Sequence, residues 1–301
     1  MEVTGNAYLL RGVAGTASLT VTDSSVSAFG AATVTITAHD GSALVTDAAA
    51  TGTAGVYSYR LSAALTANLD ILTLAWTVQV DGAPETLTTV AEVIGGHLFS
   101  IAEARAFDQK QLTNAATFPD SLIDEARGRI LDTFQDICGA AFVPRYRESI
   151  IRHDGGYSAG DFGGYYQWSP ADRPELLLPF PYPRKVRSID VSYWAMDWVA
   201  WDITLSPIEL TPEGLVRTIL PHGTLRIRYE HGLDAVPAAI KKAALQVLLF
   251  ELLPDNTPER ATSVVMGDQT YRLSTADGIR KYYGIPTVDS ALARYAFSTI
   301  G

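Results

Sequence analysis

Residues 156–160 read Gly-Tyr-Ser-Ala-Gly and fit the G-x-S-x-G pattern that presents the nucleophile of many serine hydrolases. Such a site needs a strand before Ser158 and a helix directly after it. The residues that follow are rich in glycine and are broken by Pro170, so they predict no helix. His222 and His231 lie downstream, but each stands beside a glycine in an expected turn. We therefore expect no catalytic residue, and a serine hydrolase at Ser158 is the weakest alternative.

Two aspartates flank the same loop and could hold a cation. Calcium loops place an oxygen ligand at about every second residue and close with a bidentate carboxylate. Asp154 and Asp161 lack that density, and the sequence contains no zinc spacing, phosphate-binding loop or dinucleotide fingerprint. We expect no metal site and no cofactor.

Trp194, Trp198 and Trp201 recur at helical spacing and could form a sugar platform or a membrane belt. The alternation around them favours a β-hairpin whose aromatic side chains pack across strands and into a subunit contact. The densest basic cluster is short and lies in an acidic protein, which indicates a salt-bridge surface for a subunit or partner rather than for nucleic acid. Its members are Arg184, Lys185 and Arg187.

The 301-residue chain has a formal charge of −10, which argues against gripping DNA through its phosphates. An acidic surface can still line a passage through which DNA slides. Cys138 is the single cysteine, so we expect no disulfide within the chain and folding in a reducing compartment. No apolar run reaches the roughly 20 residues that cross a bilayer. The N-terminal residues lack the pattern of a signal peptide, so we expect no membrane and no export by that route.

Residues 1–95 predict an antiparallel β-sandwich. They carry two basic residues, Arg11 and Arg60, and are dominated by small and β-branched side chains. Short runs alternate between apolar and polar residues and are separated by Asp-Gly and Ala-Gly turns. Six or seven such runs are typical of an immunoglobulin-like (Ig-like) domain. His39, beside one of these turns, is expected at the surface.

From residue 98 the pattern changes to helices mixed with antiparallel strands. A capping box at Ser100 and Glu103 opens a short helix, and a longer helix ends at Gly139. After Pro237, residues 238–253 form a helix that is apolar nearly all round, which indicates burial inside the subunit or against a neighbouring one. Strands are expected within residues 145–153, 179–194, 198–205, 214–220 and 224–232. The prediction is therefore two domains, an all-β Ig-like sandwich over 1–95 and an α+β domain over 98–301 with a C-terminal tail at 285–301.

Four passages in residues 98–301 carry a resemblance to a known family. They are Ile-Cys-Gly-x-x-Phe-x-Pro-Arg at 137–145, the proline-marked strand at 176–192, the strand ending Tyr-x-x-Gly before Val-Pro and the long apolar helix, and Gly-Ile-Pro-x-Val-Asp at 284–289. Together they resemble the head–tail connector (adaptor, or head-completion) proteins of tailed bacteriophages. The Ig-like segment lies outside this resemblance.

The resemblance implies a non-enzymatic virion protein. It implies a subunit of a homo-oligomeric ring, commonly twelvefold, that docks under the portal protein, extends the DNA channel and binds the next tail-side protein. Genomic DNA would pass through without specific binding. The protein would assemble in the host bacterial cytoplasm and reside in the virion at the head–tail junction. The main alternative is a surface-binding decoration module that uses the Ig-like domain.

Three sets of residues are candidate contacts. By analogy with the family, the tail would bind the portal through Ile285, Pro286, Val288, Leu292, Tyr295 and Phe297. The loop between two expected strands would contact a neighbouring subunit or the tail through Tyr157, Phe162, Tyr165, Tyr166 and Trp168. The apolar helix would join subunits through Ile240, Val247, Leu248 and Phe250. Truncation after Gly284 is expected to leave a folded subunit that does not bind the portal.

Overall fold

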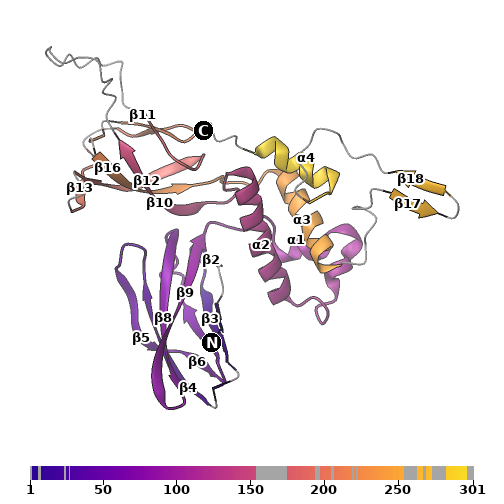
Figure 1. Cartoon of the computed structure of the whole chain (residues 1–301), viewed down its shortest axis with the longest axis horizontal. Coiled ribbons are helices and arrows are strands. Elements are labelled where there is room, and N and C mark those ends of the chain that lie inside the picture. Colours follow the sequence, from indigo (N-terminus) through magenta and orange to yellow (C-terminus); the bar gives the residue numbers. More distant parts are fainter. Residues whose placement is uncertain are drawn as a thin grey trace, which may run out of the picture. The chain divides into compact units, whose positions relative to one another are not determined.

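The computed structural model is of the α+β class: most of its elements are strands, joined by a smaller number of helices (Figure 1). It describes residues 2–5, 8–23, 25–26, 28–153, 175–193, 197–204, 207–218, 220–221, 223–253, 263–266, 269–272 and 283–296. The chain forms two compact units, each made of two separate stretches. The β unit consists of Met1–Gly96 and Pro144–Gly232, and the helical unit consists of His97–Val143 and Leu233–Gly301. This division cuts across the predicted second domain.

Two sheets of the β unit form a sandwich from residues 2–94 (Figure 1). One sheet has the order β1-β3-β7-β6 and the other β2-β9-β8-β4-β5. The strands are β1 (Glu2–Gly5), β2 (Tyr8–Leu10), β3 (Gly15–Thr22), β4 (Phe29–Thr37), β5 (Ala43–Ala49), β6 (Thr51–Thr53), β7 (Val56–Leu61), β8 (Asp70–Val80) and β9 (Ala83–Ile94). The sequence predicted fewer strands, because β1, β2 and β6 are too short to show an alternation.

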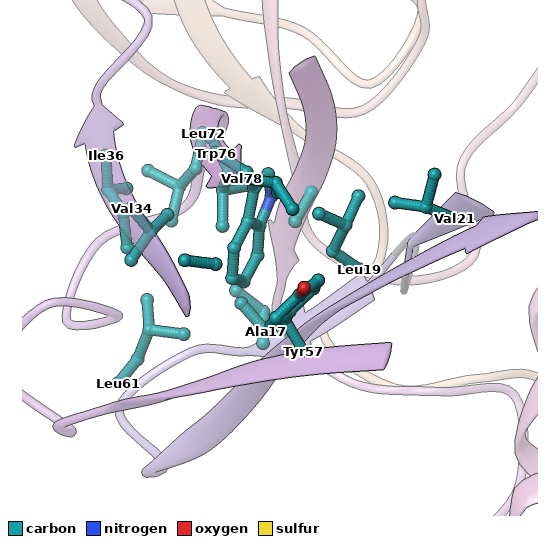
Figure 2. Packing of buried hydrophobic residues seen from close by; sticks show 14 of the residues in the cluster. Ala17, Leu19, Val21, Val34, Ile36, Tyr57, Leu61, Leu72, Trp76 and Val78 are labelled. Atoms are coloured by element: carbon teal, nitrogen blue, oxygen red, sulfur yellow. The ribbon is translucent and has the colours of Figure 1, made fainter. Parts of the chain in front are cut away.

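The sandwich core follows from the period-two pattern, since alternate residues of each strand point inward. Figure 2 shows the Trp76 indole among side chains of both sheets, with Leu19 and Tyr57 from one and Val34 and Leu72 from the other. All five are buried. The buried indole donates from Nε1 to the Thr89 hydroxyl oxygen at 2.9 Å, which satisfies its polar atom.

Beyond the sandwich, the β unit has a four-stranded sheet with the order β10-β16-β12-β13, which is antiparallel throughout and is termed the second sheet below. Its strands are β10 (Arg145–His153), β12 (Pro183–Ser192), β13 (Val199–Trp201) and β16 (Gly223–His231). One face packs on a three-stranded sheet of β11 (Glu175–Leu177), β15 (Leu215–Arg217) and β14 (Glu209–Leu210), and the two share a core that includes Ile189, Leu225 and Ile227. The β12–β13 pair confirms a hairpin here, and the packing of its tryptophans into a subunit contact stays a prediction.

The helical unit contains α1 (Ile101–Ala106), the 3₁₀ helix η1 (Asp108–Thr113), α2 (Asp120–Cys138), α3 (Ala238–Leu252) and α4 (Pro286–Tyr295). It also includes the strand pair β17 (Ser263–Met266) and β18 (Gln269–Arg272). The capping box at Ser100 and Glu103 is confirmed, and Gly139 ends α2 in the left-handed conformation as predicted. The buried side of α2 is centred on Ile123, Ile130 and Phe134, and Leu122 and Ile137 lie at its margins.

Candidate functional site

The face of the second sheet that points away from its core carries an ion-pair network. Strand register places Arg228 opposite Glu148 and Arg226 opposite Asp190. Arg228 donates from Nε to Glu148 at 2.9 Å and lies 3.2 Å from Asp190, which also accepts from Arg226 at 2.8 Å. These side chains are partly buried, so the pairs are screened less than exposed ones.

Aromatic rings cover two arginines of this face, Arg226 and Arg187. The Arg226 guanidinium lies 4.5 Å from the Trp198 ring centre, and Arg187 lies 5.0 Å from that of Tyr146. Arg187 also bonds Glu230 at 2.7 Å. Arg187, Arg226 and Arg228 are therefore paired within the chain, and their arrangement is poorly suited to binding phosphates. Arg187 itself, which the sequence assigned to a partner surface, is paired internally.

A buried charged cluster joins the sandwich to the second sheet within the β unit. Glu92 on β9 accepts from Arg145 Nε at 2.8 Å and lies 3.3 Å from Arg147, both on β10. Arg145 also reaches the Tyr8 hydroxyl on β2 at 3.3 Å. The Arg145 side chain is 4% exposed and that of Glu92 10%. Removing one member of such a cluster leaves an uncompensated buried charge.

His39 adds a second contact between the same two layers. Its Nε2 lies 3.2 Å from Glu148 Oε2, and its ring meets Tyr146 edge-on at 5.3 Å. The sequence predicted a surface residue beside a turn, and His39 does lie in that turn with 29% of its side chain exposed. The contact of this turn with β10 joins distant segments, and local sequence does not reveal it.

The sequence also placed His231 in a turn, but it lies at the end of β16 and is fully buried. Its ring packs on Phe180 at 4.9 Å and on Tyr229 at 5.8 Å, and neither ring nitrogen has a hydrogen-bond partner among the described residues. Burial, with a smaller effect of Arg147 and Arg145, lowers the pKa of His231 to about 3. A buried imidazole with so low a pKa is a weak base without access to substrate.

The predicted portal-binding tail begins as part of the helical unit. Ile285, Val288 and Leu292 are buried, and α4 contacts both α2 and α3. Pro286 is exposed, Tyr295 is half-buried and packs edge-on against Phe142, and Phe297 lies outside the described residues. Truncation after Gly284 was expected to leave a folded subunit. That expectation needs correction, because the cut would remove buried residues of α4 from the core of the helical unit.

The Gly-Ile-Pro-x-Val-Asp passage has a structural explanation. Gly284 has a positive φ of 74°, Ile285 is the N-cap of α4, and Pro286 occupies the first turn, where its missing N–H costs nothing. The Asp289 carboxylate accepts from the backbone N–H groups of Tyr283 and Gly284 at 2.8 and 3.0 Å. These residues build the start of a helix, and their role in binding a portal stays a prediction.

The remaining candidate residues are for the most part either buried within the single chain or outside the described residues. Ile240, Val247 and Leu248 are buried within the single chain, and Phe250 is half-buried, so this set is largely covered without a partner. Cys138 is buried as expected, and burial raises the pKa of its thiol to about 12. The loop residues Tyr157, Phe162, Tyr165, Tyr166 and Trp168 lie outside the described residues, as do Asp154, Ser158, Asp161, Trp194 and His222.

Among the described residues, no group of three or more His, Cys, Asp or Glu side chains is placed to hold a metal ion. None of the described helices combines the length and apolar character needed to cross a membrane. No protein-family model matches the sequence, and a search of curated proteins found no significant match.

Proposed function

We propose that the chain is a structural subunit of a phage head–tail connector ring. It would dock under the portal, extend the DNA channel and bind the next tail-side protein. The observation that carries the proposal is the passage from β16 into α3. The strand ends Tyr229-x-x-Gly232, where Gly232 has a φ of 103°, and the chain then continues through Pro237 into an apolar helix packed with α2 and α4.

The order of strands supports an Ig-like identity for residues 1–95. The sheet β1-β3-β7-β6 corresponds to strands A-B-E-D of an Ig-like domain, and β9-β8-β4 of the other sheet corresponds to G-F-C. The N-terminal segment divides between the sheets, with β1 antiparallel to β3 and β2 parallel to β9. Trp76 on β8 fills the core, and the sandwich contains no cysteine.

The distribution of charged residues along the chain bears on why DNA would pass through the ring without binding. Residues 1–96 contain eight carboxylates and two arginines, so most of the net negative charge lies in the sandwich. In the segment that resembles the connectors, acidic and basic residues nearly balance. We infer that DNA would pass this segment without sticking because most of the arginines that the structure describes there form ion pairs, more than because the surface is strongly acidic.

Deletion of the gene from the phage genome tests the proposal. The expected result is DNA-filled heads and separate tails that do not join, with joining restored when the full chain is supplied in trans. In wild-type virions, a tag on the chain should be seen at the head–tail junction by electron microscopy. Normal virions without the protein, or a tag seen only on fibres or capsid faces, would contradict the proposal.

A second function, ligand binding by the Ig-like domain, is favoured by the loops at one end of the sandwich. Hydrogen bonds hold these connections in place: Val21 N of β3 donates to Gly55 O in the β6–β7 turn at 2.8 Å, and Ala28 N donates to the Asp81 carboxylate of the β8–β9 turn at 2.8 Å. Loops held on a rigid sandwich commonly bind ligands. Purified residues 1–96 should then bind host cells or phage capsids, and absence of binding to both would exclude this function.

A further inference from the structure

The second sheet has two outer strands, and each is bonded on one side only among the described residues. β10 pairs with β16, and β13 pairs with β12. The outward N–H and C=O groups of such edges can bond another strand. Large exposed apolar side chains accompany both edges. Ile150 on β10 is 63% exposed, and at the other edge Val199 is 55% exposed and Trp198 37%.

We propose that neighbouring copies of the chain join head to tail by pairing β13 of one copy with β10 of the next, which continues the second sheet across the joint. The inference rests on the proposed ring and names its subunit contact. The four strands alternate in direction, so β13 runs opposite to β10. A second copy in the same orientation would therefore pair antiparallel, and a head-to-tail contact of this kind forms a ring when its rotation closes.

The side chains at the two edges match face by face. Val199 and Ile151 both lie on the core face, opposite Val191 and Leu225 respectively. Ala200 and Ile150 both lie on the charged face, opposite Asp190 and Arg226.

A register that pairs Val199 with Ile151 therefore places Ala200 opposite Ile150. Trp198, which stacks on Arg226, is then diagonal to Ile150 on the same face. Aromatic and β-branched residues in such positions stabilise pairing between strands.

A second copy fits these edges better than a polyanion does. The arginines of the adjoining face are engaged by Asp190, Glu148 and the Trp198 ring, so the face offers few unpaired cations to phosphates. Two complementary edges on opposite sides of one sheet are what a head-to-tail contact between copies requires. The helix predicted to join subunits is a poorer candidate, because Ile240, Val247 and Leu248 are already buried.

Disulfide trapping tests the contact. We would prepare the full-length single variants Ile150→Cys and Ala200→Cys, the double variant, and a control that pairs Ile150→Cys with Leu44→Cys, an exposed residue of the sandwich. Residues directly opposite in an antiparallel pair have Cβ atoms about 4.5–5.5 Å apart, close enough for a disulfide after small adjustments. The native Cys138 is buried and unreactive, so it gives no background.

The expected result is a cross-linked dimer when the two single variants are mixed, a ladder of higher oligomers from the double variant, and neither from the control pair. Cross-linking of Ile150→Cys with itself, oligomers without the Ile150–Ala200 link, or a chain that stays monomeric at high concentration would each overturn the inference. A failure of this contact can be distinguished from a failure of the proposed function. A working ring without this link refutes the contact alone, and the link in a protein absent from the head–tail junction refutes the proposed function alone.

Discussion

At the scale of single residues, His231 couples the stability of the β unit to pH. Its folded-state pKa of about 3 lies below the ordinary value of 6.5, so the unfolded chain binds more protons between these pH values. The contribution of the neutral His231 ring to the stability of the β unit is fully present above pH 6.5 and is lost as the pH falls toward 3. At pH 5 the loss amounts to about 2 kcal/mol.

His231→Phe should remove this dependence while keeping a ring against Phe180. The tryptophans that the structure describes, Trp76, Trp198 and Trp201, belong to the β unit, and the sequence of the helical unit contains none, so tryptophan fluorescence during urea unfolding reports on the β unit. Between pH 7 and pH 5 the variant should lose about 2 kcal/mol less than the wild type. An equal loss in both proteins would show that His231 is not responsible.

Gly95 is required by a close approach rather than by a special φ. Its N–H donates to the Pro144 carbonyl at 2.8 Å, and a Cβ at this position would lie 2.7 Å from ring atoms of Pro144. Gly95→Ala should therefore cost about 1–3 kcal/mol in urea unfolding. Gly96→Ala is the matched control, because a Cβ there meets nothing within 4 Å, and it should be neutral or slightly stabilising. Equal effects would refute the close approach.

At the scale of elements, α4 belongs to the core of the helical unit. Leu292→Asp would bury an unpaired charge beside α2 and α3, whereas Ala293→Asp places the same charge at an exposed position one residue later. We expect the first variant to lose several kcal/mol and to behave like a truncation after Gly284. The helical circular-dichroism signal during thermal unfolding measures both. A truncated chain as stable as the wild type would show that α4 is dispensable.

The sequence predicted well those elements whose own residues show a regular apolar periodicity or a clear end. β10, β16 and α3 have clear periodicity, and α2 ends at a glycine. Pairing between distant segments has no such signal. The parallel β2–β9 pair involves only three residues of β2, too few for a pattern. Glu92 occupies a polar position in an alternating strand, and only the contact with β10 shows that it is buried. The sequence predicted strands at β10 and β13 but not that they form the edges of their sheet, because an edge is defined by what does not pair with it.

At the scale of the whole molecule, the sandwich and the second sheet should behave as coupled but separable parts. The sandwich core is built from residues 9–93, so a fragment of residues 1–96 should fold by itself. In the full chain, however, Glu92 forms ion pairs with both Arg145 and Arg147 on β10. The same carboxylate therefore stabilises the full chain and has no cationic partner from β10 in the fragment.

Glu92→Gln measured in both contexts tests this coupling. In the full chain it should lower the free energy of unfolding of the β unit by about 3–5 kcal/mol, because two arginines are left without their buried counter-ion. In the fragment it should change stability by less than about 0.5 kcal/mol, because the residue is then at the surface. Glu85→Gln, an exposed change on the same strand, is the control in both contexts. Equal losses in fragment and full chain would mean that Glu92 acts within the sandwich, and no loss in either would mean that the cluster does not couple the two layers.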